Sequence, residues 1–390
     1  MNKKVAAIAT VILGIAFLVA VSMFDWNSIN FYKKNTTDSL NYVRARVVSI
    51  TSESVTQDSA DPELYLGEQE ISVEILEGDQ AGETVTFTNY LTAIHSIFVE
   101  KNTQVIVCAD TPENASPYYT IFNYDRSTPL MCVIVFFAFV MILIGGRKGI
   151  GALLGVGFSV LTVILFMAQA IFHGFNPIAI TLLTVLISTG VSLLLLNGFS
   201  RRTASGVIST LAGVGVTAIV FLIAASTLHL TGYNTETAED LLMIQDATGL
   251  SVRYLLIAAV LISAMGAVMD VAVSLAAALE ELVSVNPTMT RRDLFKSGMN
   301  IGKDMIGTMS NTLILAFAGT ALNTIICLLG YGYSMTQLFS SDYLTVEITE
   351  GLCATIGVIL TVPVSAMISS LFFIKKEEKK VVKSVKKRKK

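Results

Sequence analysis

The sequence predicts an α-helical polytopic membrane protein with about eight transmembrane helices and one small extracytoplasmic β-barrel-like domain. Three observations lead to this fold class. The 390 residues are 53% hydrophobic and only 15% charged, with a mean hydropathy of +0.66, which is typical of chains that reside in lipid. Apolar stretches recur at the length that a bilayer requires. One polar region, large enough for a small independent core, separates the first stretch from the others.

The apolar stretches give the order of the elements. A hydrocarbon core of about 30 Å needs roughly 20 apolar residues at about 1.5 Å each in a helix. The chain meets this need near residues 4–24, 128–145, 150–172, 177–197, 206–230, 252–274, 305–329 and 350–374. The predicted parts are an N-terminal transmembrane anchor over 1–24, an extracytoplasmic β domain over 25–127, a seven-helix body over 128–374 and a basic cytoplasmic tail over 375–390.

The first stretch has two interpretations. Its charged start, apolar middle and Ala20-x-Ser22 ending are also found in signal peptides, so residues 1–22 are either an anchor or a cleaved leader. The apolar run is long for a signal peptide. This length favours the anchor.

Charge predicts the orientation, because short cytoplasmic loops are enriched in Lys and Arg. If the N-terminus is cytoplasmic and the eight stretches cross the membrane in turn, most basic residues lie on the cytoplasmic side. All 12 tyrosines then fall in or beside the segments on the outer side. The basic tail lies on the cytoplasmic side only if the number of spans is even. We therefore expect both termini in the cytoplasm. The basic residues that define the inner side are Lys3, Lys4, Arg147, Lys148, Arg201, Arg202, Arg291, Arg292, Lys296 and Lys303.

The polar region is predicted to be a five-stranded barrel of the OB or SH3 type. Residues 42–50 (YVRARVVSI) alternate apolar and basic side chains, as a half-buried strand does. Similar segments follow, and residues 91–98 (LTAIHSIF) are a possible short helix. Such a domain either binds an oligomeric ligand through a sheet face or caps the membrane part and contacts a partner. The four further strand segments are 70–76, 83–91, 103–110 and 118–124.

Two long segments of the body carry a resemblance to a known family. Residues 265–282 (MGAVMDVAVSLAAALEEL) and 290–319 (TRRDLFKSGMNIGKDMIGTMSNTLILAFAG) closely resemble the signature region of the YibE/F-like family of bacterial integral membrane proteins, and 145–155 (GGRKGIGALLG) is similar to it as well. The resemblance implies a multi-pass protein of the bacterial cell membrane, often paired with a shorter homologue. It implies no defined biochemical activity.

Asp270 is the main functional candidate, because it is a carboxylate inside an apolar stretch. On a helix it shares a stripe of small or mixed residues spaced by four: Ile262, Gly266, Asp270, Ser274 and Ala278. An Asp facing lipid costs about 2.5 to 3.5 kcal/mol on an insertion scale, so the stripe is expected to face protein or a wet cavity. Asp270 is then a proton- or cation-coupling group, a structural residue that hydrogen-bonds to another helix, or an interfacial carboxylate near the cytoplasmic end of its span.

Polar residues of the seventh stretch are candidate partners of this carboxylate. They lie near one face of a helix and predict either the lining of a transport path or hydrogen bonds between helices: Thr308, Asn311, Thr312 and Asn323. Lys303 and Asp304 sit just before them at the predicted cytoplasmic edge. They are a candidate cytoplasmic gate, with simple anchoring of the helix as the alternative.

Other classes of function lack sequence support. There is no Walker loop, dinucleotide fingerprint, HExxH or GxSxG motif, so we expect neither an enzyme nor a cofactor. The four cysteines are scattered and predict no disulfide framework. The tail fits anionic lipids better than nucleic acid.

Two functions remain. The first is a permease or secondary transporter of unknown substrate, coupled to protons or cations through Asp270. The second is a membrane scaffold or assembly factor whose outer domain binds a partner protein or an envelope polymer. In either case the expected partners are the bilayer and a second subunit, which is another copy of the chain or the shorter homologue.

Overall fold

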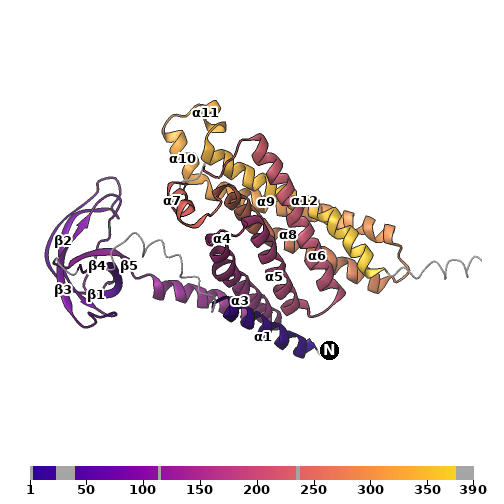
Figure 1. Cartoon of the computed structure of the whole chain (residues 1–390), viewed down its shortest axis with the longest axis horizontal. Helices are drawn as coiled ribbons and strands as arrows, with labels where there is room; N and C mark the ends of the chain where they lie inside the picture. Colours follow the sequence, from indigo (N-terminus) through magenta and orange to yellow (C-terminus); the bar gives the residue numbers. More distant parts are fainter. Residues whose placement is uncertain (1–2, 23–39, 113–115, 234–237, 375–390) are drawn as a thin grey trace, which may run out of the picture. The chain divides into compact units, whose positions relative to one another are not determined.

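The computed structural model describes residues 3–22, 40–112, 116–233 and 238–374. The chain divides into two compact units, one formed by residues 30–140 and the other by residues 1–29 together with 141–390. Figure 1 shows a curled sheet in the first unit and a bundle of helices in the second. The division falls within helix α3 (Ser127–Leu161), which follows the sheet.

Five antiparallel strands form the sheet, and each overlaps one of the predicted strand segments. Their order is β3-β2-β1-β4-β5, so the long strand β1 lies in the middle. The pairing of β1 with β2 shifts register at two points, between Val47 and Ser49 and between Ile50 and Ser52. Bulges of this kind bend a strand and increase its twist. The strands are β1 (Leu40–Gln57), β2 (Tyr65–Ile75), β3 (Thr84–Leu91), β4 (Gln104–Asp110) and β5 (Tyr118–Tyr124).

The sheet curls into a half-barrel instead of the closed barrel that the sequence predicts. Among the described strands, β3 and β5 are the two edges and are not paired with each other. The edges meet through side chains: the rings of Phe87 and Tyr119 stack with centroids 6.2 Å apart. The period-two alternation is confirmed, since Ala45 and Val47 are fully buried while Arg44 and Arg46 are exposed.

The prediction of a short helix over residues 91–98 is wrong. After β3 ends at Leu91 the chain makes a turn, in which the His95 amide donates to the Thr92 carbonyl, and continues without helix. The extended path brings Ile97 and Val99 into the core of the half-barrel, where they are 7% and 0% exposed. A helix would place fewer of these apolar side chains on the core side.

The second unit is built from helices, several of them long. Local signals explain some starts: Asn176 caps α5 through the amides of Ile178 and Ala179, and Thr290 and Asp293 form a capping box on α9. Besides α3 the elements are α1 (Lys3–Ser22), the π-helical segment η2 (Thr162–Ala168), α4 (Gln169–Phe172), α5 (Pro177–Asn197), α6 (Arg201–Thr227), α7 (Ala238–Thr248), α8 (Val252–Val285), α9 (Arg291–Thr320), α10 (Leu322–Gly330), α11 (Met335–Phe339) and α12 (Asp342–Phe373).

Within the described residues, 5 helices are long and apolar enough to cross a membrane. The number rises to 6 if α9 and α10, which are bent by 51° at their junction, form one broken span. The expected eight spans stay a prediction. The prediction of eight divides residues 127–172 into two spans. In the structure this stretch is nearly continuous helix with a break at Gly146, where φ is 53°. The eight also include the N-terminal stretch, which is helical in the structure as α1.

Close contacts between small residues hold the body together. Helix α12 packs against α6, α8 and α9, as Figure 1 shows. A Cβ placed on Gly357 would lie only 1.8 Å from Thr217 Oγ1, and one on Gly213 only 2.2 Å from Thr361 Oγ1. The absence of side chains at these glycines therefore lets α6 and α12 approach closely.

Candidate functional site

Asp270 lies on the outward face of α8, which differs from the expectation. Gly266, Asp270 and Ser274 are all exposed in the single chain. Within the part of the chain that the structure describes, the Asp270 carboxylate has no hydrogen bond and no ion pair. The stripe was expected to face protein or a wet cavity, and in the single chain these three positions are not covered by the other described helices.

The opposite face of α8 explains this orientation. That face carries Leu, Val and Ala side chains that are fully buried against α6, α9 and α12. Val268 lies beside Gly213 of α6, and Leu279 lies beside Gly298 of α9. The backbone carbonyl of Ala272 accepts a hydrogen bond of 3.3 Å from Ser365 of α12. Because larger apolar residues fill the core side, the small and polar stripe is turned outward.

The candidate residues of α9 are exposed as well. Thr308, Asn311 and Thr312 lie on the outward side of the helix, and Lys303 and Asp304 lie one to two turns before them. The two threonine hydroxyls donate to backbone carbonyls of their own helix, at 3.1 Å to Met305 and 3.0 Å to Thr308. Asn323 lies apart, on α10 beyond the bend, and is also exposed.

The level of these residues along the two helices can be compared through one contact. A Cβ on Gly298 would lie 3.1 Å from Leu279 Cδ1, so these two positions lie within about one turn of the same level on α8 and α9, which run antiparallel from their short connection. Nine residues before Leu279 on α8 is Asp270, and nine residues after Gly298 on α9 is Gly307. Because the two helices are antiparallel, both steps lead toward the same end of the bundle, so Asp270 lies near the level of Gly307. Lys303 is one turn, about 6 Å, nearer the end where the two helices join.

The bend between α9 and α10 forms a cavity that the sequence did not reveal. A straight span over 305–329 was expected, but the helix ends at Thr320 and restarts at Leu322. The cavity has a volume of about 320 Å³ and is walled mainly by apolar side chains, among them Phe317, Ile325, Leu338 and Leu344. Glu347 of α12 is its one charged lining residue, and its carboxylate accepts a 3.4 Å hydrogen bond from the Thr320 hydroxyl.

A second carboxylate lies near the cavity. Glu350 is half-buried and follows Glu347 by three residues, on neighbouring positions of one α12 face. A local signal for this pair exists in the sequence, since both carboxylates come just before the long apolar part of α12. Glu347 comes just before the predicted span over 350–374 and Glu350 is its first residue, so neither was expected beside a broken helix.

The β domain has two adjoining surface clefts that share Tyr42. The larger, about 500 Å³, is lined by polar and acidic residues that include Asn41, Glu77, Asp79 and Gln80. The smaller, about 320 Å³, contains Phe122, Tyr124 and Arg126. The Tyr42 and Phe122 rings pack edge to face with centroids 5.0 Å apart, and 45% and 55% of these residues are exposed.

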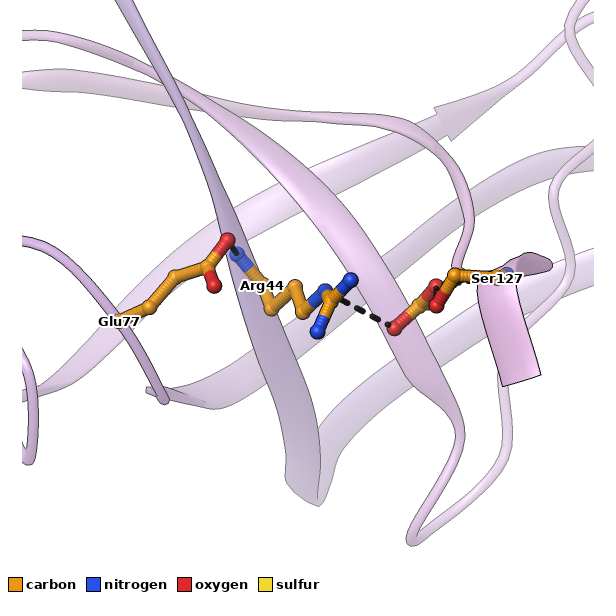
Figure 2. Close-up of polar contacts among 4 residues, drawn as sticks. Arg44, Glu77 and Ser127 are labelled. Atoms are coloured by element: carbon orange, nitrogen blue, oxygen red, sulfur yellow. Dashed lines mark hydrogen bonds and ion pairs between the residues drawn. The ribbon is translucent and has the colours of Figure 1, made fainter. Parts of the chain in front are cut away.

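A polar cluster fastens the end of β5 to β1, as Figure 2 shows. The Arg44 guanidinium lies 3.5 Å from the Asp125 carboxylate, while the Arg44 amide donates to Glu77 at 3.1 Å. Ser127 donates to Asp125 through both its hydroxyl and its amide. These hydrogen bonds, with a smaller contribution from Arg44, hold the pKa of Asp125 below its usual value.

No group of three or more His, Cys, Asp and Glu side chains suited to a metal ion occurs among the described residues. The cysteines are free thiols, with Cys353 buried, Cys108 half-buried, and Cys132 and Cys327 exposed. Neither observation indicates a redox or metal centre in these parts of the chain.

The fold is that of a mostly helical protein with several long apolar helices, consistent with a membrane protein, joined to an N-terminal β half-barrel. The chain belongs to the YibE/F-like protein family, which matches residues 133–375. The match covers most of α3 and all of the later helices, including α8, α9 and α12, but not the sheet. No curated protein and no solved structure matches the chain.

Proposed function

We propose that the protein is a multi-pass permease or secondary transporter of the bacterial cell membrane, with both termini in the cytoplasm. The observation that carries the proposal is the broken helix α9–α10, which bends by 51° beside a cavity of about 320 Å³. Discontinuous helices are the usual builders of substrate sites in secondary transporters. The substrate is unidentified.

Asp270 is the proposed coupling group. A carboxylate on a membrane helix binds a proton or a cation reversibly when it is partly shielded from water. Asp270 has no fixed partner within the described residues, so its charge is free to change without breaking a bond of the single chain. Ser274, Thr308, Asn311 and Thr312 are the proposed polar lining near it.

The remaining candidates take positions along the same route. Asn323 lies just beyond the bend, close in sequence to the cavity residue Ile325. Lys303 and Asp304 lie nearer the predicted cytoplasmic end of α9 and are the proposed gate. Under this proposal, Glu347 and the apolar cavity contact the substrate.

The test is proton-linked flux in proteoliposomes that contain a pH-sensitive dye, challenged with amino acids, organic ions and metal cations in turn. We expect one class to evoke a pH change. Asp270→Asn should abolish it while the protein stays folded and inserted, because Asn keeps the shape but cannot titrate. Asp246→Asn, an exposed carboxylate of α7, is the matched control and should leave the flux unchanged. Full flux in a well-inserted Asp270→Asn protein would remove Asp270 from the mechanism.

The second candidate function is a membrane scaffold whose outer domain binds a partner or an envelope polymer. The exposed rings of Tyr42 and Phe122, beside a polar cleft, favour this alternative. Exposed aromatic rings beside polar groups are common at binding surfaces. If every substrate class fails to evoke flux, and Tyr42→Ala with Phe122→Ala abolishes the cellular phenotype while Asp270→Asn does not, the scaffold is the better account.

A further inference from the structure

The outward face of α8 differs from the outward face of its neighbour α12. Beyond the two exposed residues that line the cavity, Ile348 and Leu352, the exposed positions of α12 carry large apolar side chains suited to lipid: Ile356, Leu360, Met367 and Leu371. Those of the apolar part of α8 carry small or polar ones: Ala259, Ser263, Gly266, Asp270 and Ser274. Because a charged Asp side chain is strongly disfavoured at the lipid surface, this face of α8 is unsuited to lipid.

Small residues on this face are also unused inside the chain. Gly213, Gly298 and Gly302 each sit against a neighbouring helix. By contrast, a Cβ on Gly266 or on Gly307 of α9 would meet none of the described atoms within 4 Å. Exposed small residues on membrane helices permit the close approach of another helix.

The neighbouring face of α9 carries two exposed lysines, Lys296 and Lys303, with the exposed carboxylate of Asp304 beside the second. Exposed residues at helical spacing run along it: Lys296, Asn300, Lys303, Gly307 and Asn311. The exposed stripe of α8 carries two carboxylates, Asp270 and, further along, Glu281. Neither carboxylate has an ion-pair partner within the residues that the structure describes.

The levels of these charges match. From the contact between Leu279 and Gly298, Glu281 is level with Lys296. By the same count, Asp270 lies about one helical turn from Lys303, a distance that a lysine side chain can span. A rotation about the membrane normal keeps every residue at its level. Two copies related by such an axis can therefore place α8 of one against α9 of the other, with carboxylates opposite lysines.

We propose that a second copy of this chain covers the α8–α9 face. The interface is isologous: α8 of each copy packs on α9 of its partner, so every contact occurs twice. Asp270 pairs with Lys303 of the partner subunit, and Glu281 pairs with Lys296 of the partner subunit. The second copy keeps lipid away from Asp270. This proposal requires α8 and α9 to lie in the membrane, but it does not depend on transport.

Charge reversal in two co-expressed copies tests the pairing. Expressed alone, Asp270→Lys or Lys303→Asp places like charges opposite each other at both contacts. Mixed, the two variants restore opposite charges at both contacts, because each copy supplies what the other lacks. We expect the dimer fraction of either variant alone to fall roughly tenfold or more, and that of the mixture to return close to the wild-type value.

The readout is stepwise photobleaching of labelled protein in lipid vesicles, with a pull-down between two tags as a second measure. Asp246→Lys and Lys148→Asp, which are exposed on other helices, serve as matched controls and should remain dimeric. A wild-type protein that is monomeric at every density overturns the proposal, as does a mixture that does not recover. Recovery of a different polypeptide on this face, with no second copy, also overturns it.

Cysteine cross-linking covers the case in which charge reversal prevents folding. In a variant without the four natural cysteines, Gly266→Cys in one copy and Asn311→Cys in the other lie at matched levels and should form a cross-linked dimer. Leu360→Cys in both copies, on the outward face of α12, should form none. Equal cross-linking of both pairs, or none from Gly266→Cys with Asn311→Cys, would contradict the interface. A wild-type protein that forms these dimers but evokes no flux with any substrate class would count against the transport proposal alone.

Discussion

The β domain and the helical body achieve specific packing in different ways. Inside the β domain, Gln69 is fully buried and its amide joins distant strands and loops: it donates to Val99 and Glu53 and accepts from Val99 and Asn89. Inside the body, the buried polar residues are mostly Ser and Thr, and many return a hydrogen bond to the carbonyl four residues earlier. Examples are Thr181, Thr210, Thr217, Thr355 and Thr361.

This difference follows from the backbone. A helix satisfies its own backbone groups, so contacts between helices depend on shape and on small residues. A curled sheet with an irregular segment leaves backbone groups that need side-chain partners, as Val99 does. The β domain should therefore be sensitive to lost hydrogen bonds, and the body to added volume.

The largest effect is expected from added volume between α6 and α12. In Gly357→Val, the new Cβ would lie 1.8 Å from Thr217 Oγ1 and 2.8 Å from Thr217 Cβ. Overpacking at such a contact costs about 3 kcal/mol or more, because two buried helices must separate. Thermal unfolding in detergent should show a much lower midpoint. Gly215→Val is the matched control, since no described atom lies within 4 Å of its added Cβ. Equal midpoints for the two variants would refute the shape argument.

The next effect concerns the amide network of the β domain. Gln69→Leu keeps a similar volume but leaves the Val99 amide and carbonyl without their side-chain partner. Each buried unsatisfied group costs about 1 to 3 kcal/mol, so a total loss of about 3 kcal/mol is expected. A fragment spanning residues 40–130 should first give a β-type circular dichroism spectrum, and urea unfolding then measures the loss. Gln57→Leu, at an exposed position, should change stability by less than about 0.5 kcal/mol.

How far the sequence could predict this structure depends on the kind of information each part needs. The strands were predictable because a half-buried strand alternates, as Arg44, Ala45, Arg46 and Val47 do. The extended path through Ile97 and Val99 was not, since it depends on Gln69, which is distant in sequence. Local pattern therefore gave the strands but not the irregular segment that completes their core.

The candidate site shows the same limit in the body. Helical periodicity placed Asp270, Gly266 and Ser274 on one face, and they do share it. Periodicity does not say which face the neighbouring helices cover, and here they cover the opposite one. The bend after Thr320 follows Gly319, which is its one local signal, but a single glycine inside an apolar run does not by itself predict a break.

A smaller effect is expected from the carboxylate that joins β5 to β1. The pKa of Asp125 is lowered in the folded domain, so the folded state binds this proton more weakly than the unfolded chain. The stabilisation is therefore present above the unfolded pKa of about 4 and is lost as the pH falls through the folded value. Asp125→Asn should cost roughly 1 kcal/mol at pH 7, and the difference from wild type should shrink in acid.

Urea unfolding of the 40–130 fragment at neutral and acid pH measures this dependence, since the fragment keeps Ser127. Asp79→Asn, at an exposed carboxylate in the larger cleft, is the matched substitution control. If Asp125→Asn lowers the free energy of unfolding equally at both pH values, Ser127 does not hydrogen-bond preferentially to the ionised Asp125 carboxylate.

The smallest effect is expected from a hydrogen bond between two helices of the body. The hydroxyls of Ser205 on α6 and Ser369 on α12 lie 2.9 Å apart, and both residues are fully buried. Hydrogen bonds of this kind in membrane proteins average about 0.6 kcal/mol in double-mutant cycles, because the unfolded state in the membrane also finds partners. Ser205→Ala, Ser369→Ala and the double variant should give a coupling energy of about this size in reversible unfolding. Ser209→Ala is the matched control: its hydroxyl is buried one turn along α6 and has no partner among the described residues, so its removal should be neutral or slightly stabilising. A coupling energy several times larger would mean that long-range hydrogen bonds, and not only shape, set the packing of the body as they do in the β domain.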